Sequence, residues 1–211
     1  MLEWPVDARS ATGLIDGPAG AIEVDVDLPD DSPRGVIVVC HPHPQQGGTK
    51  DNKVVFMLGR AATQSGFASV RFNFRGVGRS EGGYDAGVGE VDDVHAVCDW
   101  AADASALELG GLAGFSFGSA AALRAAERRT VPRLVTVGFP AAYFEASVPR
   151  PDTDWLAIFG DADDVIDVRA SIETVSELRP PVDVQILEGA GHFLHGRLTD
   201  LRKRVAAFLQ G

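Results

Sequence analysis

The pattern of apolar and polar positions changes character about one sixth of the way along this 211-residue chain. Residues 10–28 form two apolar segments around a Gly- and Pro-containing turn at 16–20, and the second segment alternates strictly, which predicts an antiparallel hairpin. By contrast, every position from 36 to 40 is apolar, as is typical of a strand covered on both faces of a parallel sheet. The chain therefore begins with a hairpin and continues into a buried sheet.

After residue 50, helical and strand-like segments alternate. The pattern predicts strands over 68–74, 112–115, 133–139, 155–159 and 182–187, and helices over 51–65, 90–103, 119–128, 167–178 and 198–209. This alternation predicts one α/β domain over residues 1–211, with a mostly parallel sheet, an antiparallel N-terminal edge and helices on both faces. In such sheets ligands and chemistry gather at the carboxyl ends of the strands, so we expect catalytic residues directly after strands.

Composition narrows the function classes. A net charge of -11 and a pI near 4.8 argue against nucleic acids and anionic membranes as partners. Cys40 and Cys98 fall in an apolar strand and an apolar helix, so we expect two buried, reduced thiols. The N-terminus has no signal-peptide pattern, and no segment is apolar enough to span a membrane. We therefore expect a cytoplasmic protein.

The segment from Gly114 to Gly118 stands between a predicted strand and a predicted helix, with Ser116 at its centre. A serine between two glycines on such a sharp turn is typical of a nucleophile elbow, which lifts the hydroxyl above the sheet. The backbone N–H of Phe117, at the start of the helix, would point toward a developing oxyanion. Ser116 is therefore the candidate nucleophile.

A candidate acid lies in the loop after the strand at 155–159, where three aspartates compete. We choose Asp163, because the pattern Gly-x-x-Asp-x-x followed by an aliphatic residue, here Gly160 to Ile166, is the usual loop around the acid in hydrolases of this build. Asp164 is the second choice, and we expect Asp161 to hydrogen-bond its own turn.

A candidate base follows the next strand, at 182–187. His192 stands in a Gly-rich loop, where the backbone can turn an imidazole toward a neighbouring strand end. His195 is the alternative, but we expect it to open the last helix.

The loop after residue 40 reads His41-Pro42-His43-Pro44. The prolines have no N–H, so the backbone N–H of His43 is the one donor that the motif offers to an oxyanion hole, beside that of Phe117. The His-x-His pattern also occurs at the start of some zinc sites, but there it is followed by Asp-His, whereas glutamines follow it here. The other histidines form no cluster with the spacing of zinc ligands. The Gly-rich segment 76–82 resembles a dinucleotide-binding motif, but its third glycine comes one residue too late for that motif. We expect neither a metal nor another cofactor.

Taken together, the chain resembles the α/β-hydrolase superfamily and, within it, a small lidless bacterial serine-hydrolase family with esterase-like activity. The order Ser116, Asp163, His192 along the chain is that of the superfamily. The segments that carry the resemblance are 41–49, 51–55, 71–82, 114–118, 160–163 and 191–195. The resemblance implies an eight-stranded sheet, a Ser116–Asp163–His192 triad and activity on small acyl esters.

The resulting hypothesis is a serine hydrolase that cleaves small carboxylic esters through an acyl-enzyme, with a small acyl ester as its partner. Thioesterase or acyltransferase use of the same triad, a peptidase and a non-catalytic ligand-binding protein remain as alternatives. Only about fifteen residues, 140–154, stand where cap domains enter this fold, so we expect no lid and an open site. We read Arg75 as structural and expect it to pair with a carboxylate. The sequence names no substrate-binding residue, natural substrate or oligomeric state.

Overall fold

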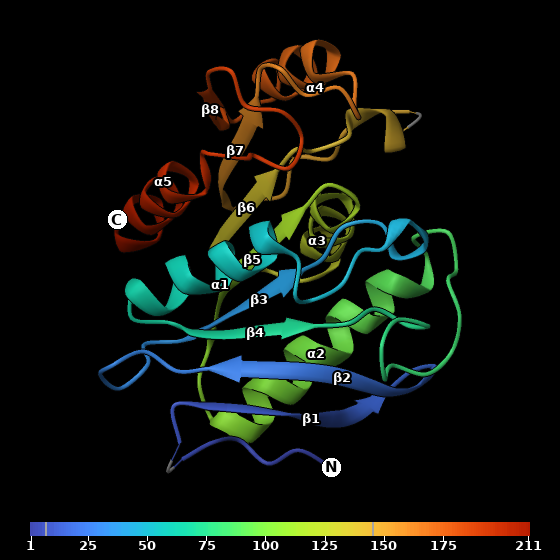
Figure 1. Ribbon diagram of the computed structural model, residues 1–211, viewed down its shortest axis with the longest axis vertical. Helices are drawn as coiled ribbons and strands as arrows, with labels where there is room; N and C mark the ends of the chain where they lie inside the picture. The colour runs from blue at the N-terminus through green and yellow to red at the C-terminus, as the bar shows by residue number, and fades with distance from the viewer. Residues whose placement is uncertain (7, 145) are drawn as a thin grey trace.

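One eight-stranded sheet runs through the computed structural model, which describes residues 1–6, 8–144 and 146–211 (Figure 1). The strand order is β1-β2-β4-β3-β5-β6-β7-β8. The strands are β1 (Ser10–Gly17), β2 (Gly20–Asp27), β3 (Val36–Cys40), β4 (Ala68–Phe72), β5 (Leu109–Phe115), β6 (Arg133–Val137), β7 (Asp154–Gly160) and β8 (Asp183–Leu187). β1 and β2 are antiparallel to their neighbours and the other pairs are parallel, which confirms the predicted sheet.

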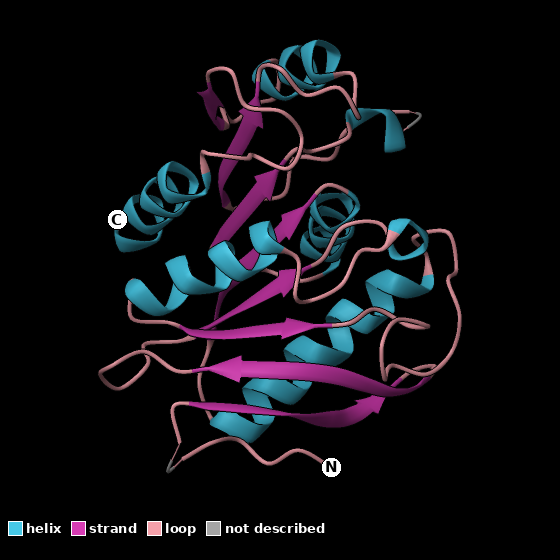
Figure 2. Ribbon diagram, viewed as in Figure 1, coloured by secondary structure: helices cyan, strands magenta, loops and turns pink. Residues whose placement is uncertain are grey.

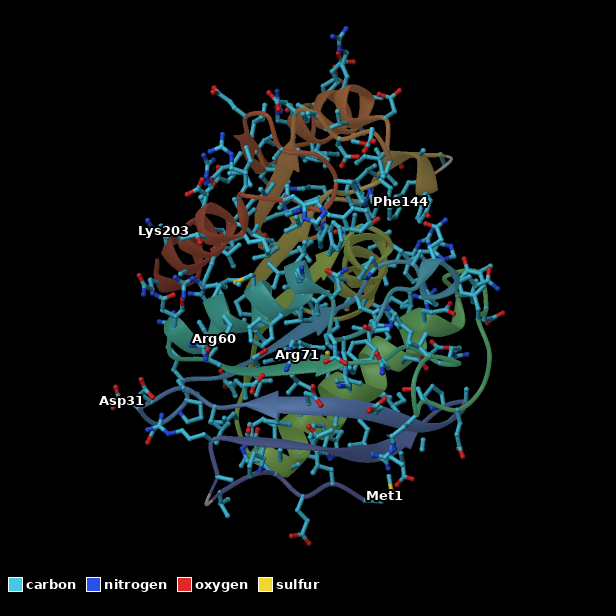
Figure 3. All side chains as sticks on the ribbon, in the orientation of Figure 1. Met1, Asp31, Arg60, Arg71, Phe144 and Lys203 are labelled. Atoms are coloured by element: carbon cyan, nitrogen blue, oxygen red, sulfur yellow. The ribbon has the colours of Figure 1, made fainter. Side chains whose placement is uncertain are left out.

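Five α-helices and two short 3-10 helices lie in the described part of the chain, and α5 follows the last strand. Figure 2 shows the α-helices packed on either side of the sheet. They are α1 (Lys53–Gln64), α2 (Gly89–Ser105), α3 (Phe117–Arg128), α4 (Val168–Ser176) and α5 (Leu198–Gln210), with η1 (Pro44–Gln46) and η2 (Ala141–Tyr143). Among the side chains drawn in Figure 3, Arg60 and Lys203 mark α1 and α5, and Phe144 marks the β6–β7 connection.

The apolar run of β3 is explained by its position between two cores. Ile37 and Val39 pack with α1 and α5 on one face of the sheet, whereas Val38 and Cys40 pack with α2 and α3 on the other. Because successive side chains of a strand point to opposite faces, a strand between two helical layers must be apolar at every position. Cys40 and Cys98 are both buried free thiols.

The central strand is longer than its apolar pattern predicts. β5 begins at Leu109, three residues before the predicted start. Leu109 and Gly111 pair with Val36 and Ile37 of β3, the register shifts at Gly110 between them, and the two glycines contribute no side chain to the apolar pattern. A Cβ on Gly110 would lie 2.5 Å from the Phe67 ring, so the close packing there requires glycine. Within the described residues, no helix has the length and apolar character needed to cross a bilayer.

Candidate active site

Ser116 lies on the sharp turn between β5 and α3, with φ 54° and ψ −121°. This positive φ is unfavourable for a residue with a side chain, and the surrounding backbone enforces it. The N–H of Ser116 donates to the carbonyl of Val137 on β6 at 2.8 Å. A Cβ on Gly114 would lie 2.2 Å from the Gly118 carbonyl oxygen, and a Cβ on Gly118 would lie 2.3 Å from that of Cys40. Both glycines are therefore needed for strand and helix to approach so closely.

The hydroxyl of Ser116 ends a line of hydrogen bonds. Its Oγ lies 3.0 Å from Nε2 of His192, and Nδ1 of the same imidazole lies 2.7 Å from Oδ2 of Asp163. Burial raises the pKa of Asp163, but hydrogen bonds from His192 and from the N–H groups of Val165 and Ile166 outweigh it and lower the pKa. An ionised carboxylate only accepts, so Nδ1 carries the proton and Nε2 is free to accept from the serine.

The loops that carry the acid and the imidazole are tied to each other. The N–H of Gly189 donates to Oδ1 of Asp161 at 2.6 Å, and the N–H of Ala162 donates to the carbonyl of Ala190. The expectation that Asp161 bonds its own turn was therefore wrong, because the turn after β8 offers it a better-placed donor. Asp164, the second choice for the acid, is exposed.

The imidazole of His192 is held by aromatic neighbours. Its ring centroid lies 4.9 Å from that of Phe115 and 5.3 Å from that of Phe193. His195 does not open the last helix as expected, because α5 begins at Leu198 and His195 lies in the exposed turn before it.

The loop after β3 passes close to Ser116. The His43 ring contacts that of Phe117 at a centroid distance of 5.2 Å, and both His43 and Ser116 line one cavity. The N–H groups of His43 and Phe117 donate to no acceptor within the described ranges. An oxyanion hole requires two such donors without a protein acceptor.

The two histidines of this loop are distinct in their hydrogen bonds. His41 is fully buried; its Nε2 accepts from the N–H of Phe74 at 3.0 Å, so Nδ1 donates to the carbonyl of Pro42. Burial lowers the pKa of His41 to about 4. His43 accepts from the N–H of Gln45 at Nδ1, and its Nε2 lies 3.3 Å from the Tyr84 hydroxyl. Neither imidazole is arranged as a metal ligand.

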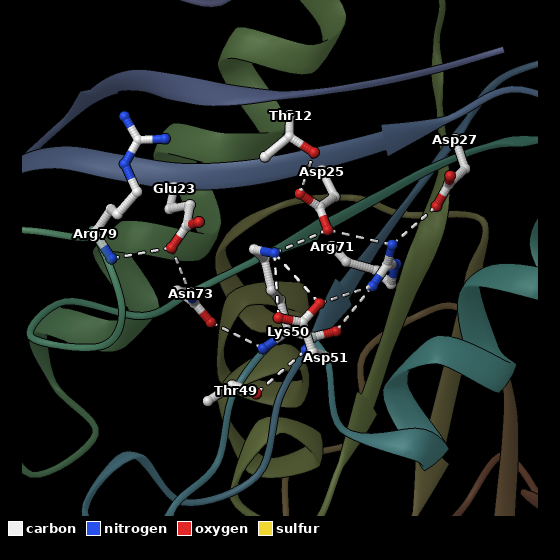
Figure 4. A network of polar contacts seen from close by, with 10 residues as sticks. All are labelled: Thr12, Glu23, Asp25, Asp27, Thr49, Lys50, Asp51, Arg71, Asn73 and Arg79. Carbon is white, nitrogen blue, oxygen red and sulfur yellow. Dashed lines mark hydrogen bonds and ion pairs between the residues drawn. The ribbon is translucent and has the colours of Figure 1, made fainter.

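The far end of this loop is anchored in a buried network of charges (Figure 4). Nζ of Lys50 lies 2.9 Å from Oδ2 of Asp25, and the Arg71 guanidinium lies 3.0 Å from Asp27. The Lys50 backbone is held as well, since its N–H donates to Asn73 and its carbonyl accepts from Arg71. The network fixes where the loop ends and α1 begins.

Arg75, in the Gly-rich segment after β4, pairs with a carboxylate, as predicted. Arg75 forms a two-pronged pair with Asp93 of α2, with Nη2 2.7 Å from Oδ1. Gly76 and Gly78 have φ values of 75° and 57°, so they supply the left-handed turns of the segment. In the described part of the chain, no group of three or more His, Cys, Asp or Glu side chains is placed to hold a metal ion.

A cavity of about 560 Å³ lies beside Ser116. The β6–β7 connection forms one wall and the start of α4 the other, with Tyr143, Phe144 and Val165 among the lining residues. The connection forms no cap domain, as expected. It does enclose one side of the site, however, so the site is less open than expected. Sequence reasoning missed Val165, because no motif marks it.

Comparison with known proteins agrees with this geometry. Residues 16–146 match the family model of the X-Pro dipeptidyl-peptidases (S15 family). A lidless α/β serine hydrolase from Xanthomonas campestris is 36% identical, with 100% of this chain and 97% of that chain covered and a TM-score of 0.92. An α/β serine hydrolase homologue from Coxiella burnetii is 40% identical over 93% of this chain and 96% of that chain, with a TM-score of 0.89.

A protein of Rickettsia prowazekii without a characterised function is 31% identical over 207 residues, which covers 92% of this chain and 86% of that protein. The family model matches more than half of the chain, and both similar structures are α/β serine hydrolases, the one from Xanthomonas campestris being without a lid. The chain therefore belongs to the S15 family of X-Pro dipeptidyl-peptidases, among the lidless α/β serine hydrolases.

Proposed function

We propose that this protein is a serine esterase that cleaves small carboxylic esters through an acyl-enzyme. The observation that carries the proposal is the continuous line of hydrogen bonds from Ser116 through His192 to Asp163. A nucleophile, a base in contact with it and an acid that orients the base are the groups that acyl transfer to water requires.

The reaction begins when Nε2 of His192 takes the proton of Ser116 as Oγ attacks the ester carbonyl. Asp163 keeps Nδ1 protonated and stabilises the imidazolium, while the N–H groups of His43 and Phe117 stabilise the oxyanion. The imidazolium then protonates the leaving alcohol. Water, deprotonated by the same imidazole, releases the acid and restores the serine.

Peptidase activity is the second candidate, because the matched family is that of X-Pro dipeptidyl-peptidases. A dipeptidyl-peptidase must hold the charged N-terminal amine of its substrate. Asp167 is the one carboxylate among the described residues that line the cavity, and its Oδ1 already caps α4 by accepting from the N–H of Ala170 at 3.0 Å. An esterase does not need a free carboxylate in the cavity, whereas a dipeptidyl-peptidase does. The cavity therefore favours ester substrates over dipeptides.

A fluorophosphonate probe followed by mass spectrometry tests whether Ser116 is an activated nucleophile. We expect stoichiometric labelling of Ser116, none in Ser116→Ala, and normal labelling in Ser176→Ala, which alters an exposed serine of α4. Hydrolysis of p-nitrophenyl butyrate should fall by about 10³-fold or more in Ser116→Ala. Unchanged turnover would refute the assignment, and faster cleavage of an Xaa-Pro anilide than of the ester would favour the peptidase.

A further inference from the structure

The side chains that line the cavity beside Ser116 favour some acyl groups over others. This inference rests on the proposed esterase function. Small and aliphatic side chains dominate its far walls, including Ala141, Ala142 and Val148 from the β6–β7 connection and Val165, Ile166 and Ala170 from the segment that leads into α4. No lysine or arginine is among the described residues that line it.

The path of the proton indicates which half of an ester would occupy this cavity. The leaving oxygen must receive its proton from Nε2 of His192, so the alcohol lies on the imidazole side. The cavity is lined by Ser116 and His43 but not by His192 or Phe193. Phe193 instead borders a second hollow, of about 400 Å³, at the start of α1. The acyl group therefore points into the larger cavity, and the alcohol departs toward Phe193.

Three of the polar side chains on the walls are already engaged with the protein. Oδ1 of Asp167 accepts from the N–H of Ala170, Oγ of Ser171 accepts from the N–H of Ala141, and Oγ1 of Thr174 donates to the carbonyl of Ala170. A carboxylate on the acyl chain would meet no counter-charge in the described lining and would face Asp167. Burial of a charge without a partner is costly, so the walls disfavour charged acyl groups.

Size gives the second constraint. A methylene group occupies about the volume of one water, roughly 30 Å³, so a straight chain of about eight carbons takes roughly 240 Å³. Such a chain fits within the cavity with space to spare, whereas an acetyl group leaves nearly all of the apolar wall uncovered. We infer that the substrate class is esters of uncharged, apolar acyl groups longer than acetyl, with Ala170 on the wall that their chain would cover.

A series of p-nitrophenyl esters from acetate to palmitate tests this inference. Each buried methylene should raise kcat/KM by up to roughly fourfold, so the hexanoate and octanoate should exceed the acetate by at least about tenfold. A p-nitrophenyl ester of succinate should be cleaved at least about tenfold more slowly than the butyrate. A flat chain-length profile, or equal rates on the charged and uncharged esters, would overturn the inference.

Ala170→Phe places a large ring in the cavity, and Glu173→Phe places the same ring on an exposed part of α4 outside it. We expect Ala170→Phe to lower the ratio of kcat/KM for the octanoate to kcat/KM for the acetate by at least about tenfold. Glu173→Phe should keep the wild-type profile. Equal profiles in all three proteins, with Ser116 still labelled by the fluorophosphonate, would refute the acyl cavity and leave the esterase proposal intact. Loss of labelling in the wild type would instead refute the esterase proposal.

Discussion

His192 and Asp163 lie 29 residues apart in the chain, yet Nδ1 of the one is 2.7 Å from Oδ2 of the other. Both side chains are almost fully buried, with exposed fractions of 3% and 1%. The carboxylate fixes the tautomer in which Nε2 faces the Ser116 hydroxyl, which is the form that can accept a proton.

Asp163→Asn should reverse that tautomer, because an amide can donate to Nδ1 and leave the proton on Nε2. We expect kcat for p-nitrophenyl butyrate to fall by about 10³- to 10⁴-fold without loss of the fold. Asp164→Asn alters the exposed neighbour and should change kcat by less than about twofold. Steady-state kinetics measures kcat of both variants, and circular dichroism checks their folding. Equal values of kcat for the two variants would contradict the assignment of Asp163.

The backbone of Ser116 predicts an unusual order of stabilities. With φ at 54°, any side chain at this position is strained, so Ser116→Gly should be more stable than Ser116→Ala by about 1 kcal/mol. At Ala104, an exposed position inside α2, the change to glycine should instead cost about 0.5–1 kcal/mol. Urea denaturation measures both differences. A less stable Ser116→Gly would mean that the turn is not strained.

Stability should fall in acid because of His41. Its pKa is about 4 in the fold against an ordinary value of 6.5, so the unfolded chain binds more protons between these two pH values. The contribution is complete above pH 6.5 and is lost as the pH falls to 4, and it amounts to roughly 3 kcal/mol. Protonation of Nε2 would also end its hydrogen bond from the N–H of Phe74.

The test compares free energies of unfolding in urea at pH 7 and pH 4.5. His41→Gln keeps a neutral acceptor for the Phe74 N–H, so it should lose stability at pH 7 but show a smaller fall toward pH 4.5 than the wild type. His195→Gln removes an exposed histidine and should retain the wild-type fall. An unaltered fall in His41→Gln would contradict the role of His41.

Lys50 is the central cation of the network in Figure 4. Burial lowers the pKa of its amine, but the hydrogen bond and charge of Asp25 and the nearby Asp51 outweigh this and raise it. Lys50→Met should remove the closest charged partner of the buried Asp25, which among the described residues would keep Arg71 at 3.3 Å and a hydrogen bond from Thr12. We expect a loss of about 2–4 kcal/mol.

Lys53→Met, at an exposed position one turn away on α1, should change stability by less than about 0.5 kcal/mol. Thermal unfolding of both variants gives the comparison. If Lys50→Met were as stable as Lys53→Met, the network would have no part in anchoring the loop before α1.

The order of elements and the candidate site residues could be predicted from the sequence, because both leave local marks. A strand between two helical layers must be apolar at every position, as residues 36–40 are, and a strained serine turn must carry small neighbours, as Gly114 and Gly118 show. Asp163 was separable from Asp161 by spacing alone.

Only the tertiary structure decided how segments distant in sequence meet. Which strands are neighbours in the sheet determines three features: the hydrogen bond between Asp161 and Gly189, the position of His195 before α5, and the buried partners of Lys50. The cavity beside Ser116 depends on two connections that pack against each other without any shared motif. Such contacts leave no periodic or local signal in the chain, because their energy comes from complementary shape and charge across the fold.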